Sequence, residues 1–388
     1  MKKAAVFLII FSVMLWGATG ISTNNGSTNT LKTIRVGYCQ GEEYYEFDHA
    51  LNYLILALAE RNLIGPLSKD ALSPYATSRE TWEMLSRYNQ SDWIVQFSPK
   101  AYFSLTDSEY AELSEEAAAE IMLEVVREED IDLIVVCGTF GALTALNLSD
   151  ECGVISLAAA DPLRSQIVYA EETSQRENVW ALVDTNAFNR SIMVMNDILK
   201  PKTLGVVYAN NDDAYIYSGV HDLDEFSEEN GITVVKRYVD DPQSADSDED
   251  LQRYYREMTA AYEQLAEEGI DVFIMTTSLL EMEDLKTFLE PFYEKNIPVF
   301  SINDTNEVKY GALMAVEISD YKNIGRFTAD TISAYLKGKA LSGLSQVYQT
   351  APFLVINYDT IKRIGYKPDF QMLLVASEIY TEQPSADE

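Results

Sequence analysis

The sequence predicts an α/β fold of two lobes, each built on a doubly wound parallel sheet, joined by a hinge of several chain crossovers. Short apolar runs alternate with amphipathic stretches of helical period, a pattern typical of parallel strands joined by crossover helices. The alternation occurs in two successive blocks, and 388 residues with 47% hydrophobic content are enough to bury two cores. We therefore expect a cleft between the carboxyl edges of two sheets.

The first block follows a polar leader and contains apolar runs with helical stretches between them. Its expected strands cover residues 33–39, 93–97, 133–137 and 154–158, and its expected helices cover residues 47–61 and 114–128. In the first helix, Leu51, Leu54, Ile55 and Leu58 fall on one face. Residues 62–92 fit the alternation less well. We expect an irregular insertion there, to which the sequence assigns no function.

The second block repeats the alternation over a longer stretch of chain. Its expected extended segments cover residues 180–183, 203–208, 233–238, 271–276, 297–302 and 312–318, and its expected helices cover residues 187–199, 217–230, 251–268, 279–295 and 321–337. Gly231 and Gly269 follow two of these helices, as is typical of helix ends.

Crossovers between the lobes are expected near residues 160, 300 and 345. The first lobe would then comprise residues 33–161 and about 304–345, and the second residues 162–303 and about 346–378. Residues 379–388 would form a tail.

The amino terminus has the composition of a secretory signal. Lys2 and Lys3 precede a run of roughly 13 apolar residues, which is short for a bilayer span, and small residues follow up to Gly20. We expect cleavage of residues 1–20, with a retained anchor as the alternative. Residues 21–32 are rich in Ser, Thr, Asn and Gly and are expected to form a flexible leader.

Charge and motif content exclude several classes of function. The formal charge of −33 opposes binding to nucleic acid, which depends on Lys and Arg, and opposes contact with an anionic membrane surface. The two histidines, His49 and His221, belong to no metal-ligand or nucleophile motif. The acidic stretch at residues 240–250 lacks the central glycine of a calcium loop. We therefore expect no catalytic residue, no metal and no cofactor.

One segment of the second block indicates a family. Residues 296–368 contain, in order, a short strand, a polar turn at Asn303-Asp304, a second strand and a helix. This order resembles the carboxy-terminal third of the solute-binding proteins of ABC importers with the periplasmic binding protein type I fold. It is most similar to the branch that includes aromatic-amino-acid binders. Shorter pieces extend the resemblance over most of the chain, among them Ile131-Asp132-Leu133, Ala160-Asp161-Pro162, Leu204-Gly205-Val206 and Ile297-Pro298-Val299.

The resemblance implies a binding protein and not an enzyme. Such proteins close around a small-molecule solute by hinge bending and deliver it to the membrane subunits of an ABC permease, and we expect a monomer. A sensory module that reports ligand occupancy to a membrane receptor is the alternative with the same fold. The identity of the ligand stays open. The candidates, in order of preference, are aromatic amino acids, other amino acids, nucleosides and small peptides.

The positions of the cysteines bear on localisation. Many relatives are lipoproteins with a cysteine directly after the signal, whereas the first cysteine here is Cys39. We therefore expect a freely diffusing protein, periplasmic or secreted. Cys137 and Cys152 would lie at opposite ends of neighbouring parallel strands, so we expect no disulfide between them.

The candidate ligand-binding residues follow from strand direction. Ligands of open parallel sheets bind outside the carboxyl ends of the strands, where helix amino termini expose free amides. The residues at these positions are Tyr38, Cys39, Gln40, Gly138, Thr139, Phe140 and Asp161 in the first lobe, and Tyr208, Asn210, Thr276, Thr277, Asn303 and Asp304 in the second. Aromatic rings in these loops could stack against a flat solute.

Each polar candidate also has a purely structural interpretation. Thr139 and Thr277 could cap the helices that follow them. Asp161 could shape the hinge, and Asn303 and Asp304 could form an Asx turn. On the ligand-binding interpretation, the turn around Thr139 would suit a carboxylate, and Asn303 or Asp304 would suit a polar group such as an amine. Both interpretations stay open from sequence alone.

Overall fold

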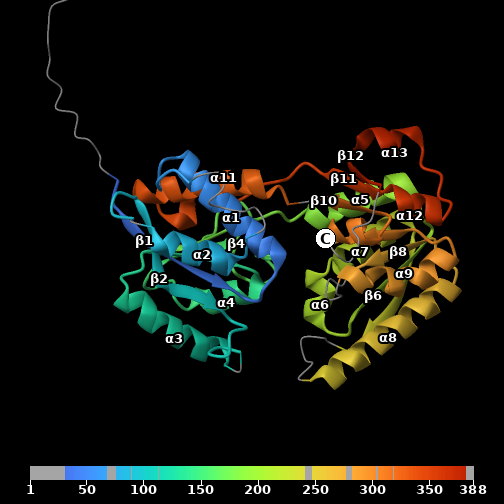
Figure 1. Ribbon diagram of the computed structural model, residues 1–388, viewed down its shortest axis with the longest axis horizontal. Helices are drawn as coiled ribbons and strands as arrows, with labels where there is room; N and C mark the ends of the chain where they lie inside the picture. Colours follow the sequence, from blue (N-terminus) through green and yellow to red (C-terminus); the bar gives the residue numbers. More distant parts are fainter. Residues whose placement is uncertain are drawn as a thin grey trace, which may run out of the picture.

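The computed structural model describes residues 31–67, 76–88, 90–111, 113–240, 247–276, 282–302, 305–317 and 319–381. Within these ranges the chain folds into two α/β lobes that lie side by side, each around its own sheet (Figure 1). The strand order is β2-β1-β3-β4-β5 in the first sheet and β12-β11-β10-β9-β8-β6-β7 in the second. The predicted fold class, two lobes on mainly parallel sheets, is confirmed.

The first lobe contains a five-stranded sheet in which every strand pair is parallel. Its strands are β1 (Ile34–Gln40), β2 (Val95–Ser104), β3 (Leu133–Cys137), β4 (Gly153–Leu157) and β5 (Val179–Ala181), and its helices include α1 (Tyr45–Glu60), α2 (Ser78–Arg87), α3 (Glu115–Glu128) and α4 (Thr139–Leu146). Residues 62–92, expected to be irregular, contain α2. This helix begins at a capping box between Thr77 and Glu80, a local signal that the prolines and tryptophans around it obscured.

The second lobe is larger, and one of its strand pairs, β10 with β11, is antiparallel. Its strands are β6 (Thr203–Ala209), β7 (Thr233–Val239), β8 (Val272–Met275), β9 (Val299–Ser301), β10 (Met314–Glu317), β11 (Phe353–Asn357) and β12 (Ala376–Tyr380). Its helices include α5 (Ala187–Leu199), α6 (Asp212–Tyr217), α7 (Val220–Asn230), α8 (Asp248–Glu267), α9 (Leu285–Glu294), α10 (Asn306–Tyr310), α12 (Tyr358–Arg363) and α13 (Phe370–Val375). The helix expected at residues 217–230 begins only at Val220, because Gly219 adopts a left-handed conformation that separates α7 from α6.

The chain passes between the lobes three times: after β5, after β10, and between η3 (Leu341–Gly343) and β11. The last crossing agrees with the sequence, but the first two lie later than residues 160 and 300. β5 belongs to the first sheet, because the buried Trp180 packs against Phe327 in the first lobe, with ring centroids 5.7 Å apart. β9 and β10 both belong to the second sheet. Strands of three or four residues carry too little pattern to indicate which sheet they join.

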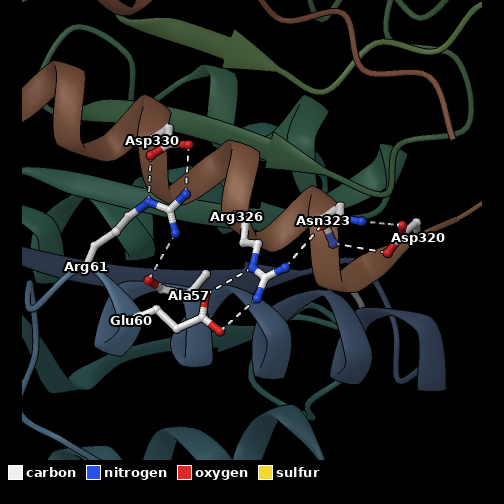
Figure 2. A network of polar contacts seen from close by, with 7 residues as sticks. All are labelled: Ala57, Glu60, Arg61, Asp320, Asn323, Arg326 and Asp330. Carbon is white, nitrogen blue, oxygen red and sulfur yellow. Dashed lines mark hydrogen bonds and ion pairs between the residues drawn. The ribbon is translucent and has the colours of Figure 1, made fainter.

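Helix α11 (Tyr321–Leu336) returns the chain to the first lobe and lies beside α1 (Figures 1 and 2). The two helices approach closely at Gly325, where a Cβ would lie 2.6 Å from the backbone carbonyl of Tyr53. Arg61 on the loop after α1 donates two hydrogen bonds to Asp330, at 2.6 and 2.7 Å (Figure 2). Arg326 donates to Glu60 at 3.0 and 3.1 Å. Residues far apart in the sequence thus complete one face of the first sheet.

Buried apolar side chains form one core in the second lobe and two in the first, one on each face of its sheet. Cys39, Cys137 and Cys152 are buried as free thiols, in agreement with the expectation of no disulfide. Across the ranges that the structure describes, we find no helix with the length and apolar character needed to traverse a membrane.

Candidate functional site

A cavity of about 750 Å³ lies between the two lobes. The first lobe contributes loop residues that follow β1, β3 and β4, and the second contributes the ends of β6 and β7, the residue after β8, and α6. The crossing segments contribute further lining residues, namely Leu182, Asp184, Ser319, Tyr348 and Thr350. The cavity therefore lies where the carboxyl edges of the two parallel sheets face each other, the usual place for a ligand in this kind of sheet.

The turn from β3 into α4 has the geometry of a binding loop. Gly138 has a φ of 85°, and a Cβ there would lie 2.6 Å from the ring of Phe47, so glycine is required on both counts. Thr139 Oγ1 accepts a hydrogen bond from the amide of Ala160, at 3.2 Å, and α4 has no side-chain cap. The Phe140 side chain is 46% exposed and lines the cavity. The first turn of α4 thus presents backbone amides and an aromatic ring to the cleft.

Aromatic rings from both lobes line the cavity. Tyr44 meets Phe47 edge to face, with ring centroids 5.4 Å apart, on the side of the first lobe. Tyr208 contacts Tyr215 and Tyr238 on the side of the second lobe, at 6.1 and 5.2 Å. Further rings in the lining are Phe140, Phe188, Tyr217, Tyr254, Tyr321 and Tyr348. Such a lining suits the face of a flat or aromatic solute.

The charged groups of the lining are acidic. They are Glu42, Glu43, Glu46, Glu115, Asp184 and Asp213, and the lining contains no Lys or Arg among the residues that the structure describes. Arg190 lies just behind the lining and pairs with Asp184, with Nη1 2.7 Å from Oδ1. Burial, and then the charge of Glu46, raises the pKa of Tyr321 well above its ordinary value, so this phenol stays neutral.

Five of the sequence-predicted residues come together in the cavity lining: Gly138, Thr139, Phe140, Tyr208 and Thr276. Thr276 lines the cavity, although its hydroxyl donates to the carbonyl of Val207 at 2.7 Å and so also stabilises the sheet edge. Burial, followed by a hydrogen bond with Tyr238, raises the pKa of Tyr208, which keeps its hydroxyl neutral.

Tyr38, Cys39 and Gln40 lie elsewhere, because β1 continues as a paired strand to Gln40. All three are buried, and Tyr38 stacks on Tyr102 with ring centroids 5.5 Å apart. The residues that enter the cleft from this end of the sheet are the next ones along the chain, beginning with Glu42.

Asp161 and Asn210 also fall outside the lining. The Asp161 carboxylate accepts hydrogen bonds from the amides of Leu163 and Arg164, at 3.1 and 2.9 Å, so it shapes the turn after β4. Asn211, the neighbour of Asn210, lines the cavity and caps α6 through a 2.7 Å bond from the Ala214 amide. Thr277, Asn303 and Asp304 lie outside the described residues.

Several lining residues are absent from the sequence-based set. Glu46 lies in the first turn of α1, and Asp184, Phe188, Tyr321 and Tyr348 lie on or next to the crossing segments. The strand-end rule considers only loops that follow strands. Correct placement of the three crossings would have found the last four of these residues, because the crossings border the cleft, but not Glu46.

The chain has two lobes, a cavity between them, and three chain crossings that border this cavity. This arrangement defines a solute-binding protein of the periplasmic type I architecture. The chain belongs to the family described as ABC transporter substrate binding protein, which matches residues 103–379. Members of this family bind solutes and are not enzymes, and the substrate-binding proteins of ABC importers work outside the cytoplasm. No curated protein sequence matches the chain.

Solved structures support the fold. The chain is similar to an ABC domain in complex with L-Trp from Streptococcus pneumonia, with 17% identity and a TM-score of 0.63. It is also similar to a conserved domain protein from Vibrio cholerae, with 21% identity and a TM-score of 0.61, and to the ligand-free, open form of a substrate binding protein with adhesive properties from Clostridium difficile, with 19% identity and a TM-score of 0.63. Each comparison covers 90% of this chain and 100% of the other.

Proposed function

We propose that this protein captures a small aromatic solute that carries an amine, of the size of an aromatic amino acid, and delivers it to an ABC permease. The observation that carries the proposal is the aromatic lining contributed by both lobes around one cavity. The cavity volume of about 750 Å³ lies within the usual range for small-molecule sites. The L-Trp bound by the relative from Streptococcus pneumonia is a solute of this kind.

Capture would work through movement of the lobes. A solute that touches both lobes stabilises the arrangement in which they are close, by the difference in its affinity for the closed and open forms. The three crossing segments carry few elements of regular structure and are the natural hinge. A permease that contacts both lobes at once would then distinguish loaded protein from empty protein.

The proposed ligand contacts include the α4 turn and the ring of Tyr208. Phe140 and Tyr208 face the cavity from opposite lobes, so a ring held between them would be in contact with both. The first-turn amides of α4 and the Thr139 hydroxyl would hydrogen-bond a polar group of the solute. The proposed contacts of Thr277, Asn303 and Asp304 rest on the sequence alone.

We also infer that residues 1–20 are removed as a secretory signal and that the mature protein diffuses freely in a periplasm. The composition of the amino terminus and the position of the first cysteine, Cys39, support this inference. Intact-mass measurement of protein recovered from the periplasmic fraction tests it. A mass that includes residues 1–20, or a lipid adduct, would contradict it.

The binding function is tested by identifying the solute. Freshly purified protein is denatured, the released small molecules are identified by mass spectrometry, and candidates are then tested by thermal shift. A true ligand at about a hundred times its dissociation constant adds roughly 2.7 kcal/mol to the free energy of unfolding. If no aromatic solute is released and none shifts the unfolding temperature, the proposal fails.

A matched pair of variants locates the site. Phe140→Ala removes a cavity ring and should weaken solute binding by about 0.5–1.5 kcal/mol. Phe370→Ala is the control, because Phe370 is 73% exposed on α13 and does not line the cavity. If the two substitutions have equal effects on affinity, the α4 turn is not part of the ligand-binding site.

A further inference from the structure

The charge of the cleft has a consequence for the kind of solute it holds. Six carboxylate side chains line the cavity, and no Lys or Arg does so among the described residues. The segments 241–246 and 277–281, which follow the lining residues Val239 and Thr276 within one or two positions, also contain no Lys or Arg. An anion entering this cleft would therefore meet no cationic side chain among these residues.

Two arginines outside the lining are paired within the protein. Arg190 lies against Asp184, and the two side chains are only 20% and 15% exposed. The pair is thus neutral overall, although Asp184 itself lines the cavity. Arg164 lies 3.4 Å from both Asp161 and Asp222, so it too has carboxylate partners outside the cavity.

Three of the six cleft carboxylates lack such a cationic partner. Glu42 and Glu115 in the first lobe and Asp213 in the second form no ion pair with any described residue, and all three line the cavity. Partial burial, and then the charge of Glu116, raises the pKa of the Glu115 carboxyl, which is expected where no cation is near. The cavity therefore carries a net negative charge contributed by both lobes.

The α4 turn offers only limited help to an anion. Gly41 packs against the first turn of α4, where a Cβ on Gly41 would lie 3.0 Å from the Gly141 amide nitrogen. The Gly138 amide already donates to the carbonyl of Leu157, at 3.2 Å. The turn supplies no cationic side chain to the cavity, and burying a carboxylate without full pairing is costly.

We propose that the cleft selects organic cations, specifically aromatic amines with a net positive charge, over zwitterionic aromatic amino acids. This inference rests on the proposed function and names the chemical class of its solute. The ring of such an amine stacks between the aromatic walls. Its ammonium group is balanced by the uncompensated carboxylates and by the faces of the tyrosine and phenylalanine rings, which attract cations.

Matched pairs of probes test the proposal. Affinities of tyramine and tyrosine, and of tryptamine and tryptophan, are measured by isothermal titration calorimetry at low and high salt. The members of each pair share a ring and an amine and differ in the carboxylate. We expect each amine to bind at least about tenfold more tightly than its amino acid at low salt, and we expect added salt to reduce this preference. N-acetyltyramine, which lacks the positive charge, should bind no better than tyrosine.

The outcomes separate this inference from the proposed function. If tyrosine or tryptophan binds as tightly as its amine or more tightly, selection of cations is wrong, while capture of an aromatic solute stands. If no member of either pair binds, selection of cations is wrong, and the solute released on denaturation then decides whether capture of an aromatic solute is wrong as well.

Two substitutions assign the preference to the cleft carboxylates. Glu42→Gln and Asp213→Asn each remove one negative charge from an exposed position of the lining, one in each lobe. Each should reduce the ratio of amine to amino-acid affinity by about threefold or more. Glu120→Gln, on the exposed face of α3 and outside the lining, is the control and should leave the ratio unchanged. A ratio that stays at the wild-type value in both cleft variants, with unfolding temperatures unchanged, overturns the proposal.

Discussion

Arg164 in the first lobe and Asp222 in the second form an ion pair, with Nη1 3.4 Å from Oδ2. Arg164 follows β4 in a loop whose Leu163 packs on the first-lobe core, whereas Asp222 lies on α7. The Asp222 side chain is only 7% exposed and also accepts a hydrogen bond from Asn189, at 3.3 Å. The pair therefore links the lobes at a point separate from the three crossing segments.

We predict that this pair couples the lobes energetically. A double-mutant cycle with Arg164→Gln and Asp222→Asn, read by urea unfolding, should give a coupling energy of about 0.5–3 kcal/mol. The matched control is Arg127 with Glu151, an exposed pair within the first lobe, for which a smaller value is expected. A coupling no larger than that of the control would mean that the contact does not hold the lobes together.

The close approach of α1 and α11 predicts an unusual effect of alanine. Alanine normally stabilises a helix interior relative to glycine by about 1 kcal/mol. At Gly325 its methyl group would overlap the backbone of Tyr53, so Gly325→Ala should lower the free energy of unfolding by about 1–2 kcal/mol net. Chemical denaturation measures the change.

Gly343→Ala serves as the control, because a Cβ at Gly343 meets nothing within 4 Å. Gly343→Ala should change the free energy of unfolding by no more than about 0.5 kcal/mol. Stabilisation by Gly325→Ala would show that the two helices are further apart than described.

The ion pair between Arg61 and Asp330 predicts a pH-dependent contribution to stability. The hydrogen bonds from Arg61 hold the pKa of the Asp330 carboxyl below its ordinary value. A lowered carboxyl pKa stabilises the fold at pH values above the unfolded pKa, and this stabilisation disappears as pH falls through the folded pKa. The free energy of unfolding of the wild type should therefore exceed that of Asp330→Asn by about 0.2–1 kcal/mol at pH 7. This difference should shrink below roughly pH 4.

Thermal unfolding of both proteins between pH 2.5 and 7 measures this difference. Glu83→Gln is the control, because its partner Arg87 lies on the same exposed face of α2. This substitution should lower the free energy of unfolding by at most about 0.3–0.5 kcal/mol. If the Asp330→Asn difference persists unchanged at low pH, its origin is not the charge of the carboxylate.

The three cysteines should be unreactive in the native protein. Burial raises the pKa of the Cys137 and Cys152 thiols to about 12 and raises that of Cys39 as well. At pH 8 these thiols would therefore be protonated, whereas the thiolate is the reactive form. Iodoacetamide should modify no cysteine in native protein and three in denaturant, as counted by intact mass. Modification of native protein would show that a thiol is accessible.

Local patterns in the sequence were sufficient for most strands and helices. The helix at residues 187–199 and the strand at 133–137 have the predicted limits, because each combines a clear apolar pattern with definite end signals. The assignment of β5 and β10 to lobes was wrong, because sheet membership depends on tertiary contacts such as those of Trp180. Short strands give no local indication of such contacts.

The candidate site was accessible from sequence only where a strand ends at a glycine-containing turn. Gly138, Thr139 and Phe140 lie in the cleft because β3 ends directly before them. Gln40 does not, because β1 remains paired to its last residue. Tyr321 and Tyr348 reach the cavity from crossing segments, and their contribution depends on how the lobes meet, which no local pattern reports.

The position of α11 in the chain dictates an order of events during synthesis. Side chains of this helix and of Leu341 complete a core whose other members all precede residue 181. A nascent chain that has just finished β5 therefore has this face of its first sheet covered only by α1 and α2, and it stays so until some 160 further residues have emerged. Truncation anywhere between α5 and α11 would leave part of that apolar face exposed. Neither lobe is a contiguous fragment, because β11 and β12 of the second sheet follow α11.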